Sequence, residues 1–260
     1  MCPQAGNAPN GAFLAKLTDP LENIGIVERR IFLSGDVYIP EVRGHLKKSI
    51  ITLPDAIQSA SGIRINGRVL RSFIFTTDVA AIRNNNADAV IAVYPFLPQP
   101  IITQAVISVA DVPVFCGIGS GIGAGGIKRA VILAKHAVYQ GAQGVVVGAN
   151  ISNEAVSEIA TAIDIPVILT VISENTDFKA RLEAGASILN VSGADKTPDI
   201  IKMIRAEYPY VPIIATGGPS DATIRDTISS GANAITYTPP TSGNLFAQKA
   251  NRSRELELKN

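Results

Sequence analysis

The sequence is poor in the residues that build disulfide frameworks and metal centres. Among its 260 residues are two cysteines, two histidines and no tryptophan, and 5% of the residues are aromatic. A chain of this length buries enough apolar surface to fold without disulfide or metal staples. No histidines, cysteines and acids cluster in the sequence, so no metal site is predicted. Cys116 stands in an apolar run and is expected to pack as a small hydrophobic residue, with a functional thiol as the alternative.

The sequence also lacks an excess of either charge. Lys and Arg total 23 against 22 Asp and Glu, giving a formal charge of +1. A near-neutral chain without long basic runs offers no electrostatic attraction to nucleic acid or to an anionic membrane. No apolar run reaches the roughly 20 residues of a membrane helix, and residues 1–20 lack the pattern of a secretion signal. A cytoplasmic location is therefore expected.

Two kinds of strand start alternate along the chain. One is an aliphatic–Pro–aliphatic triplet, which suits the beginning of a strand because the missing proline N–H removes no ladder bond there. The other is Gly-Ala directly after a helical pattern, where glycine is the expected residue at a helix C-terminus. The triplets are centred on Pro113, Pro166 and Pro212, and the Gly-Ala pairs begin at Gly141, Gly185 and Gly231.

The strands themselves read as continuous apolar runs, which indicate a parallel sheet buried on both faces. Amphipathic stretches of helical length separate them. Eight such units predict an α/β fold of the (β/α)8 or TIM barrel class, with an open doubly wound sheet as the alternative. The strands are expected near residues 69–76, 89–94, 112–117, 143–148, 165–171, 187–192, 211–216 and 233–238, with a closing helix from about residue 244.

The same pattern divides the chain into three parts. Residues 1–20 are expected to be a disordered leader, and residues 69–260 to form the barrel. Residues 21–68 are expected to be an N-terminal extension that packs on the barrel, either at its closed end or along a flank. A role as an interface arm is the alternative, which would make the protein a homo-oligomer. A glycine-rich insertion at 117–126 interrupts the repeat and is interpreted as a lid over the site, rather than as a dinucleotide fingerprint.

A phosphate site is predicted after strands seven and eight, where this architecture usually holds one. Gly217 and Gly218 allow the backbone to approach a ligand, and the next helix presents free N–H groups to an anion. Ser220, Thr241 and Ser242 supply hydroxyl groups. In the alternative interpretation, the glycines serve only a tight turn.

Few ionisable residues stand at the strand ends, so the candidates for acid–base chemistry are few. Glu174, Asp78 and Lys196 are the predicted catalytic residues, and Asn150 and Asn190 are predicted substrate contacts. Each catalytic candidate has a structural alternative. Asp78 can favour the start of a helix, whereas Glu174 and Lys196 can be solvated loop residues. A Schiff-base role for Lys196 is a third interpretation.

Val211 to Thr238 resembles the phosphate-binding half of the ribulose-phosphate-binding barrel superfamily, and the resemblance extends over Ile168 to Gly193. It is also similar to flavin barrels such as the nitronate monooxygenases. The resemblance implies that a phosphate, or the phosphate of FMN, is held at the Gly-Gly turn. Residues 29–45 resemble an uncharacterised bacterial barrel family. One departure is the Pro239-Pro240 pair, which cannot supply the backbone N–H groups expected after strand eight.

Three functions are consistent with these features. The leading one is an enzyme acting on a small phosphorylated metabolite by isomerase, epimerase or lyase chemistry, without a predicted cofactor. The first alternative is an FMN-dependent oxidoreductase that uses the same phosphate pocket. The second is a non-catalytic barrel that senses a metabolite. The reaction class is an analogy with the fold, since one fold hosts many chemistries.

Overall fold

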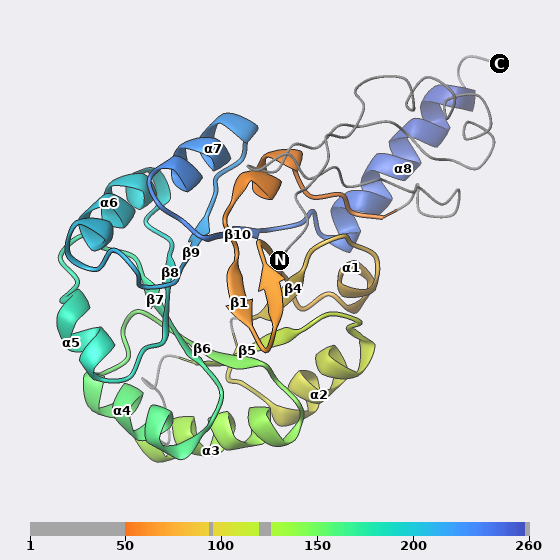
Figure 1. Ribbon diagram of the computed structural model, residues 1–260. Coiled ribbons are helices and arrows are strands. Elements are labelled where there is room, and N and C mark those ends of the chain that lie inside the picture. The colour runs from red at the N-terminus through yellow and green to blue at the C-terminus, as the bar shows by residue number, and fades with distance from the viewer. Residues whose placement is uncertain (1–49, 94–95, 120–125, 258–260) are drawn as a thin grey trace, which may run out of the picture. The chain divides into compact units, whose positions relative to one another are not determined.

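The computed structural model describes residues 50–93, 96–119 and 126–257. Eight parallel strands close into a barrel in the order β10-β3-β4-β5-β6-β7-β8-β9, and helices surround it (Figure 1). The α/β class and the (β/α)8 barrel predicted from the sequence are confirmed. The barrel strands are β3 (Ser72–Phe75), β4 (Ala89–Ala92), β5 (Val114–Gly119), β6 (Gly144–Val147), β7 (Val167–Val171), β8 (Ile188–Val191), β9 (Ile213–Thr216) and β10 (Ala234–Tyr237).

An α-helix follows every barrel strand, so each strand–helix unit of the repeat is complete. The 3-10 helix η5 (Ala194–Lys196) precedes the sixth of them. The helices are α1 (Val79–Arg83), α2 (Pro100–Val109), α3 (Gly126–Tyr139), α4 (Asn153–Ala162), α5 (Phe178–Glu183), α6 (Thr197–Glu207), α7 (Asp221–Ser229) and α8 (Ser242–Glu257).

The prolines that mark alternate strands stand one residue before β5, β7 and β9. Each proline carbonyl accepts a bond from the neighbouring strand. Val90 N–H donates to Pro113 O at 2.9 Å, and Val145 N–H and Leu189 N–H donate in the same way to Pro166 and Pro212. The prolines therefore add acceptors to the ladder while their missing N–H groups fall outside it.

The Gly-Ala pairs end helices as expected. Gly141, Gly185 and Gly231 have φ angles of 94°, 109° and 114°. This left-handed conformation is the one that glycine adopts at a helix C-terminus without a Cβ clash. Each glycine thus turns the chain directly into the next strand.

Two layers of apolar side chains form the core. The inner layer fills the barrel and includes Phe73, Phe115 and Ile168. Its two phenylalanine rings meet edge to face with centroids 5.4 Å apart. The outer layer lies between strands and helices and includes Val145 and Ile200. Both faces of the sheet are therefore buried, which explains the continuous apolar runs of the sequence.

A β-hairpin, β1 (Ile63–Ile65) and β2 (Arg68–Leu70), precedes the barrel after the 3-10 helix η4 (Asp55–Ser59). Asn66 and Gly67 form its turn with φ angles of 47° and 81°, as the Asn-Gly pair predicts. Ile63, Ile65 and Leu70 join the inner layer, so the hairpin contributes to the core at the N-terminal end of the strands. The predicted strand at 69–76 is in fact two strands, β2 and β3, because the chain turns at Arg71 from the hairpin into the barrel.

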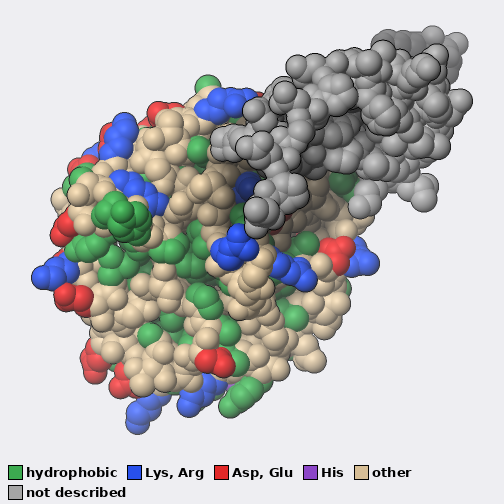
Figure 2. All heavy atoms as spheres, viewed as in Figure 1, with side chains coloured by type: hydrophobic (Ala, Val, Ile, Leu, Met, Phe, Trp, Pro, Cys, Tyr) green, Lys and Arg blue, Asp and Glu red, His purple; other side chains and the backbone are tan. Residues whose placement is uncertain are grey.

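The face of the molecule in Figure 2 carries both acidic and basic side chains around its edge. Within the described ranges, no helix is long and apolar enough to cross a membrane. The predicted leader at 1–20, the part of the extension up to residue 49, and residues 120–125 of the predicted lid lie outside the described residues.

Candidate functional site

The inside of the barrel changes from apolar to polar toward the C-terminal ends of four neighbouring strands. Ile168, Ile188, Ile214 and Ala234 belong to the apolar inner layer. Since side chains alternate between faces along a strand, the residues two positions later also face the interior. Those residues are all polar: Thr170 on β7, Asn190 on β8, Thr216 on β9 and Thr236 on β10.

Two atoms of this polar layer have no hydrogen-bond partner. Asn190 Oδ1 and Thr236 Oγ1 are buried and unpartnered within the described part of the chain, and the Thr236 residue is only 8% exposed. Thr216 differs, because its hydroxyl donates to Ser192 Oγ at 3.2 Å. Leaving a buried polar group unpaired costs about 1–3 kcal/mol. The polar layer is therefore suited to a bound molecule that supplies the missing partners.

Glu174 and Lys196 meet at the rim of the barrel although they are 22 residues apart in the sequence. Glu174 follows β7 and Lys196 ends η5 after β8. The Lys196 Nζ donates to Glu174 Oε1 at 3.0 Å, and the two side chains are 65% and 40% exposed. The pair places one acidic and one basic group beside each other on the face where barrel active sites lie.

Asp78 is the N-cap of α1, and its contacts favour the structural interpretation of this residue. Its Oδ1 accepts from the N–H groups of Ala80 and Ala81 at 2.9 and 3.3 Å. Its Oδ2 accepts from the Ser242 hydroxyl, which begins α8. The Ser242 hydroxyl, opposed by partial burial and assisted by the backbone N–H groups of Ala80, Ala81 and Ser242, holds the pKa of Asp78 below its ordinary value. A carboxyl with a lowered pKa is a weak proton donor or acceptor near neutral pH.

The Gly-Gly turn after β9 is shaped by packing as well as by conformation. A Cβ on Gly217 would lie 2.8 Å from Ile235 Cγ2 and 2.9 Å from Ile224 Cγ1. Gly218 has a φ angle of 79°, which favours glycine. Ser220 and Thr223 form a capping box at the start of α7, and Thr241 Oγ1 accepts from Asn244 N–H at 3.2 Å. These contacts hold the predicted phosphate-binding hydroxyls in the loops after β9 and β10.

Asn150 lies apart from the polar layer, in the loop after β6, and is exposed.

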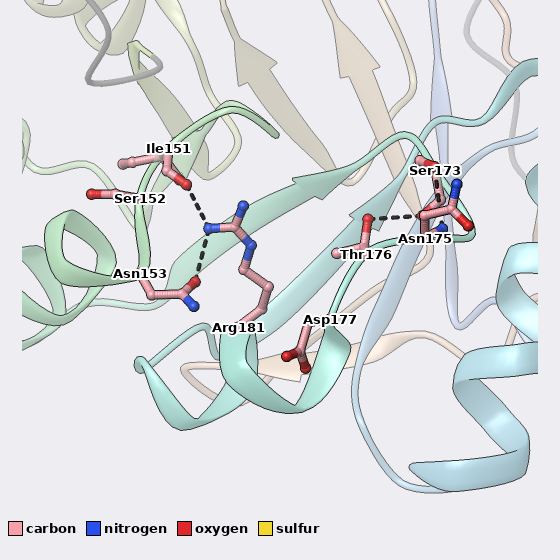
Figure 3. Close-up of a pocket in the computed structure, with 8 residues that line it drawn as sticks. All are labelled: Ile151, Ser152, Asn153, Ser173, Asn175, Thr176, Asp177 and Arg181. Carbon is pink, nitrogen blue, oxygen red and sulfur yellow. Dashed lines mark hydrogen bonds between the residues drawn. The ribbon is translucent and has the colours of Figure 1, made fainter.

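A cavity of about 410 Å³ opens between the loops after β6 and β7 (Figure 3). Sequence-based prediction named none of its lining residues. Arg181, on α5, is the basic residue among them, and Asn153 on α4 and Thr176 after β7 contribute polar groups. The contacts of Arg181 lie 28 to 32 residues earlier in the sequence, in the preceding strand–helix unit, so no local pattern signals this pocket.

The other chemistry-bearing residues stand away from these sites. Cys116 is buried in β5, and burial raises the pKa of its thiol to about 12. A protonated, buried thiol is inert, which supports the prediction that Cys116 packs as a hydrophobic residue. His136 is exposed on α3. Within residues 50–93, 96–119 and 126–257, no three His, Cys, Asp or Glu side chains come together as a metal site.

The closed parallel barrel with a helix after every strand defines a TIM barrel, and its C-terminal end carries the polar layer. No family model matches the sequence, and no curated protein matches it significantly. Among solved structures, a protein of Burkholderia cenocepacia assigned as a phosphonomutase aligns with 16% identity and a TM-score of 0.54 over 72% of this chain and 92% of that one. A phosphonopyruvate hydrolase aligns with 14% identity and a TM-score of 0.54 over 78% and 83%. A complex of phosphonopyruvate hydrolase with oxalate and magnesium aligns with 15% identity and a TM-score of 0.52 over 72% and 81%. At these identities the likeness concerns the fold.

Proposed function

We propose that this protein is an enzyme of lyase or isomerase type that acts on a small phosphorylated metabolite at the C-terminal mouth of its barrel. The observation that carries the proposal is the pair of buried, unpartnered atoms Asn190 Oδ1 and Thr236 Oγ1 in the polar layer above the apolar inner core. Buried polar atoms without partners are rare in folded proteins and call for an explanation. A substrate that fills the mouth supplies one.

The hydrogen-bonding capacity of the two atoms constrains what occupies the mouth. Asn190 Oδ1 is an acceptor and needs an O–H or N–H group, whereas Thr236 Oγ1 can donate or accept. A phosphate dianion has only acceptor oxygens and so satisfies Thr236 but not Asn190 Oδ1. The metabolite therefore carries a hydroxyl or amino group at Asn190 in addition to its phosphate.

The phosphate is proposed to lie at the Gly217-Gly218 turn and the start of α7. The helix has nine residues, and its N-terminus carries unpaired N–H groups and the positive end of the helix dipole. Ser220 already caps the Thr223 N–H, and the Ser242 hydroxyl donates to Asp78, so the phosphate is proposed to use the backbone of the turn and the Thr241 hydroxyl. Asp221 lies in the first turn of α7, and its negative charge repels an anion. This charge favours a phosphate monoanion, or a phosphate shared with the loop after β10, over a phosphate bound deeply at the helix.

The proposed chemistry uses the pair at the rim. Glu174 accepts a proton from a carbon next to a substrate carbonyl, and Lys196 stabilises the negative charge that develops on the oxygen. Their 3.0 Å separation places both groups within reach of one substrate. One structural neighbour was solved with magnesium, whereas the described residues here form no acidic cluster that would hold it, so no step is assigned to a metal ion.

A second candidate, a non-catalytic sensor barrel, is favoured by one observation. Asp78 is committed to a helix cap and to Ser242, which leaves a single carboxylate of the predicted set available for proton transfer. Binding without turnover requires no such group. The two candidates share the same ligand and differ in whether the ligand is changed.

A Glu174→Gln variant separates them. The change preserves the size and polarity of the side chain but removes its basic carboxylate. The enzyme proposal expects turnover of the metabolite to disappear while its binding, followed by calorimetry, persists. Full turnover in the variant would contradict the role of Glu174, and binding without turnover in the wild type would support the sensor.

A further inference from the structure

The 410 Å³ cavity beside the barrel mouth is separate from the polar layer. Its lining comes from the loops after β6 and β7 and the starts of α4 and α5, and none of the inward-facing polar residues of the barrel contributes. Its volume lies in the range of small-molecule sites. All but one of its lining residues are polar: Ile151, Ser152, Asn153, Ser173, Asn175, Thr176, Asp177 and Arg181.

The guanidinium of Arg181 is fixed in place by backbone and amide oxygens. Its Nη1 donates to Ile151 O and to Asn153 Oδ1, the latter at 2.9 Å, and its Nη2 donates to Ala149 O at 3.1 Å. Figure 3 shows the guanidinium on one side of the pocket and Ser173 and Thr176 on the other. The side chain is therefore already ordered before any ligand arrives, which lowers the entropic cost of binding.

Two of the five N–H groups of Arg181 have no partner in the described part of the chain, one on Nε and one on Nη2. These two groups form a planar fork that matches the two oxygens of a carboxylate. No carboxylate of the described residues forms a salt bridge with Arg181. The pocket thus presents a fixed cation with an open bidentate face.

Asp177 gives the same pocket an acidic group. Its Oδ1 accepts from Ala180 N–H at 2.9 Å as the N-cap of α5, and its Oδ2 has no partner in the described ranges. Asp177 precedes α5 and Arg181 lies within it, and both residues line the same pocket. The negative charge of Asp177 disfavours a phosphate dianion. It suits a ligand that carries a hydrogen-bond donor next to its anionic group.

We infer that this pocket binds a small carboxylate that carries an amino or hydroxyl group on the adjacent carbon. The carboxylate binds to the Nε and Nη2 fork of Arg181, and the amino or hydroxyl group donates to Asp177 Oδ2. The hydroxyl groups of Ser173 and Thr176 border the remainder of the ligand. The site lies beside the barrel mouth and is independent of the proposed phosphate site.

The test uses three probes of equal size, L-alanine, L-lactate and propionate, titrated calorimetrically into the full-length protein. L-alanine and L-lactate are expected to bind about tenfold more tightly than propionate, which lacks the donor. Asp177→Asn retains an N-cap residue and is expected to abolish this preference. Arg181→Met is expected to weaken all three probes at least about tenfold, whereas Arg225→Met, an exposed arginine on α7, leaves them unchanged.

Arg181 also ties α5 to the loop after β6, so the methionine variant is checked by circular dichroism. If it does not fold, Arg181→Lys retains the charge but lacks the fork, and it is expected to weaken binding as well. Thr236→Val changes the barrel mouth and not this pocket, so it is expected to leave the carboxylate titration unchanged. Failure of the carboxylate inference is therefore distinguishable from failure of the proposed function. No binding by any probe, tighter binding of inorganic phosphate, or equal binding in a folded Arg181 variant would overturn the inference.

Discussion

Lys196 Nζ lies 3.0 Å from Glu174 Oε1, and this contact joins the loop after β7 to the 3-10 turn after β8. Both side chains are partly exposed, at 65% and 40%. Exposed ion pairs contribute at most about 1 kcal/mol to folding, since solvent screens them. The pair therefore contributes little to folding, and its proposed role on a substrate is open to test without loss of the fold.

Removing either partner of this pair is expected to abolish turnover while leaving the fold intact. Glu174→Gln and Lys196→Met should each change the free energy of unfolding by less than about 1 kcal/mol. Lys202→Met, which loses the exposed pair with Asp199, is the matched control and should retain activity. Urea denaturation and a turnover assay on the same samples measure both quantities. A large loss of stability would reassign the pair to a structural role.

The Thr236 hydroxyl is expected to be costly for folding and useful for binding. Thr236→Val keeps the shape and removes a buried hydroxyl without a partner, so stability should stay the same or rise by about 1–2 kcal/mol while ligand affinity falls. Thr227 is the control, because it is also buried but its hydroxyl donates to Thr223 O at 2.9 Å. Thr227→Val should lower stability by about 1 kcal/mol. Thermal melts of both variants with and without ligand measure stability and ligand affinity. Lower stability of Thr236→Val, or an unchanged ligand shift, would contradict the prediction.

Gly217 is expected to tolerate no side chain. An alanine Cβ would press on Ile224 and Ile235, which line the buried side of the turn. Gly217→Ala should therefore cost about 1–3 kcal/mol of stability. Gly243→Ala is the control, since its nearest neighbour, Thr241 Oγ1, would lie 3.8 Å from the new Cβ. Equal melting temperatures for the two variants would show that the Gly217 turn adjusts easily.

Asp78 predicts a specific loss of stability in acid. Its pKa in the folded protein is below the ordinary value of 3.8, chiefly because the Ser242 hydroxyl donates to it. A lowered pKa means that the carboxylate stabilises the fold above about pH 4 and that this stabilisation is lost as the pH falls through the folded pKa. Asp78→Asn keeps a capping residue without the titrating group. The wild type should therefore lose stability faster than Asp78→Asn below about pH 4, and parallel urea curves would contradict this.

The barrel was predictable because its units repeat. The prolines at 113, 166 and 212 and the glycines at 141, 185 and 231 each punctuate a strand, and the structure places every one of them at a strand or helix end. The division of the first predicted strand was not foreseen, because only the polar pair Arg71-Ser72 separates the apolar residues of β2 from those of β3. The hairpin pairing is local, but the pairing of β3 with β4 and β10 depends on long-range contacts that a local pattern does not contain.

The candidate site was predictable in part. Glu174 and Lys196 were named from their positions after strands, but their pairing required the register of β7 and β8. The inward threonines were missed because a threonine at a strand end looks the same whether it faces the lumen or the helices. Counting two residues onward from Ile168, Ile214 and Ala234 would have found them once the inner face was known. Arg181 was missed because two of its three partners are main-chain oxygens, which have no sequence signature, and the third, Asn153, lies 28 residues away.

The most direct test of the central claim is a melting-temperature titration with inorganic phosphate, a panel of pentose and hexose phosphates, and FMN, on the wild type and Thr236→Val. A ligand at 100 times its dissociation constant stabilises the folded state by about 2.7 kcal/mol, which a melt detects readily. The account predicts that at least one sugar phosphate raises the wild-type melting temperature and that Thr236→Val reduces this shift. A shift with FMN alone would identify the ligand of the barrel mouth as a flavin and not a sugar phosphate. No shift with any phosphorylated compound, or an equal shift in both proteins, would contradict a phosphorylated ligand in the barrel mouth.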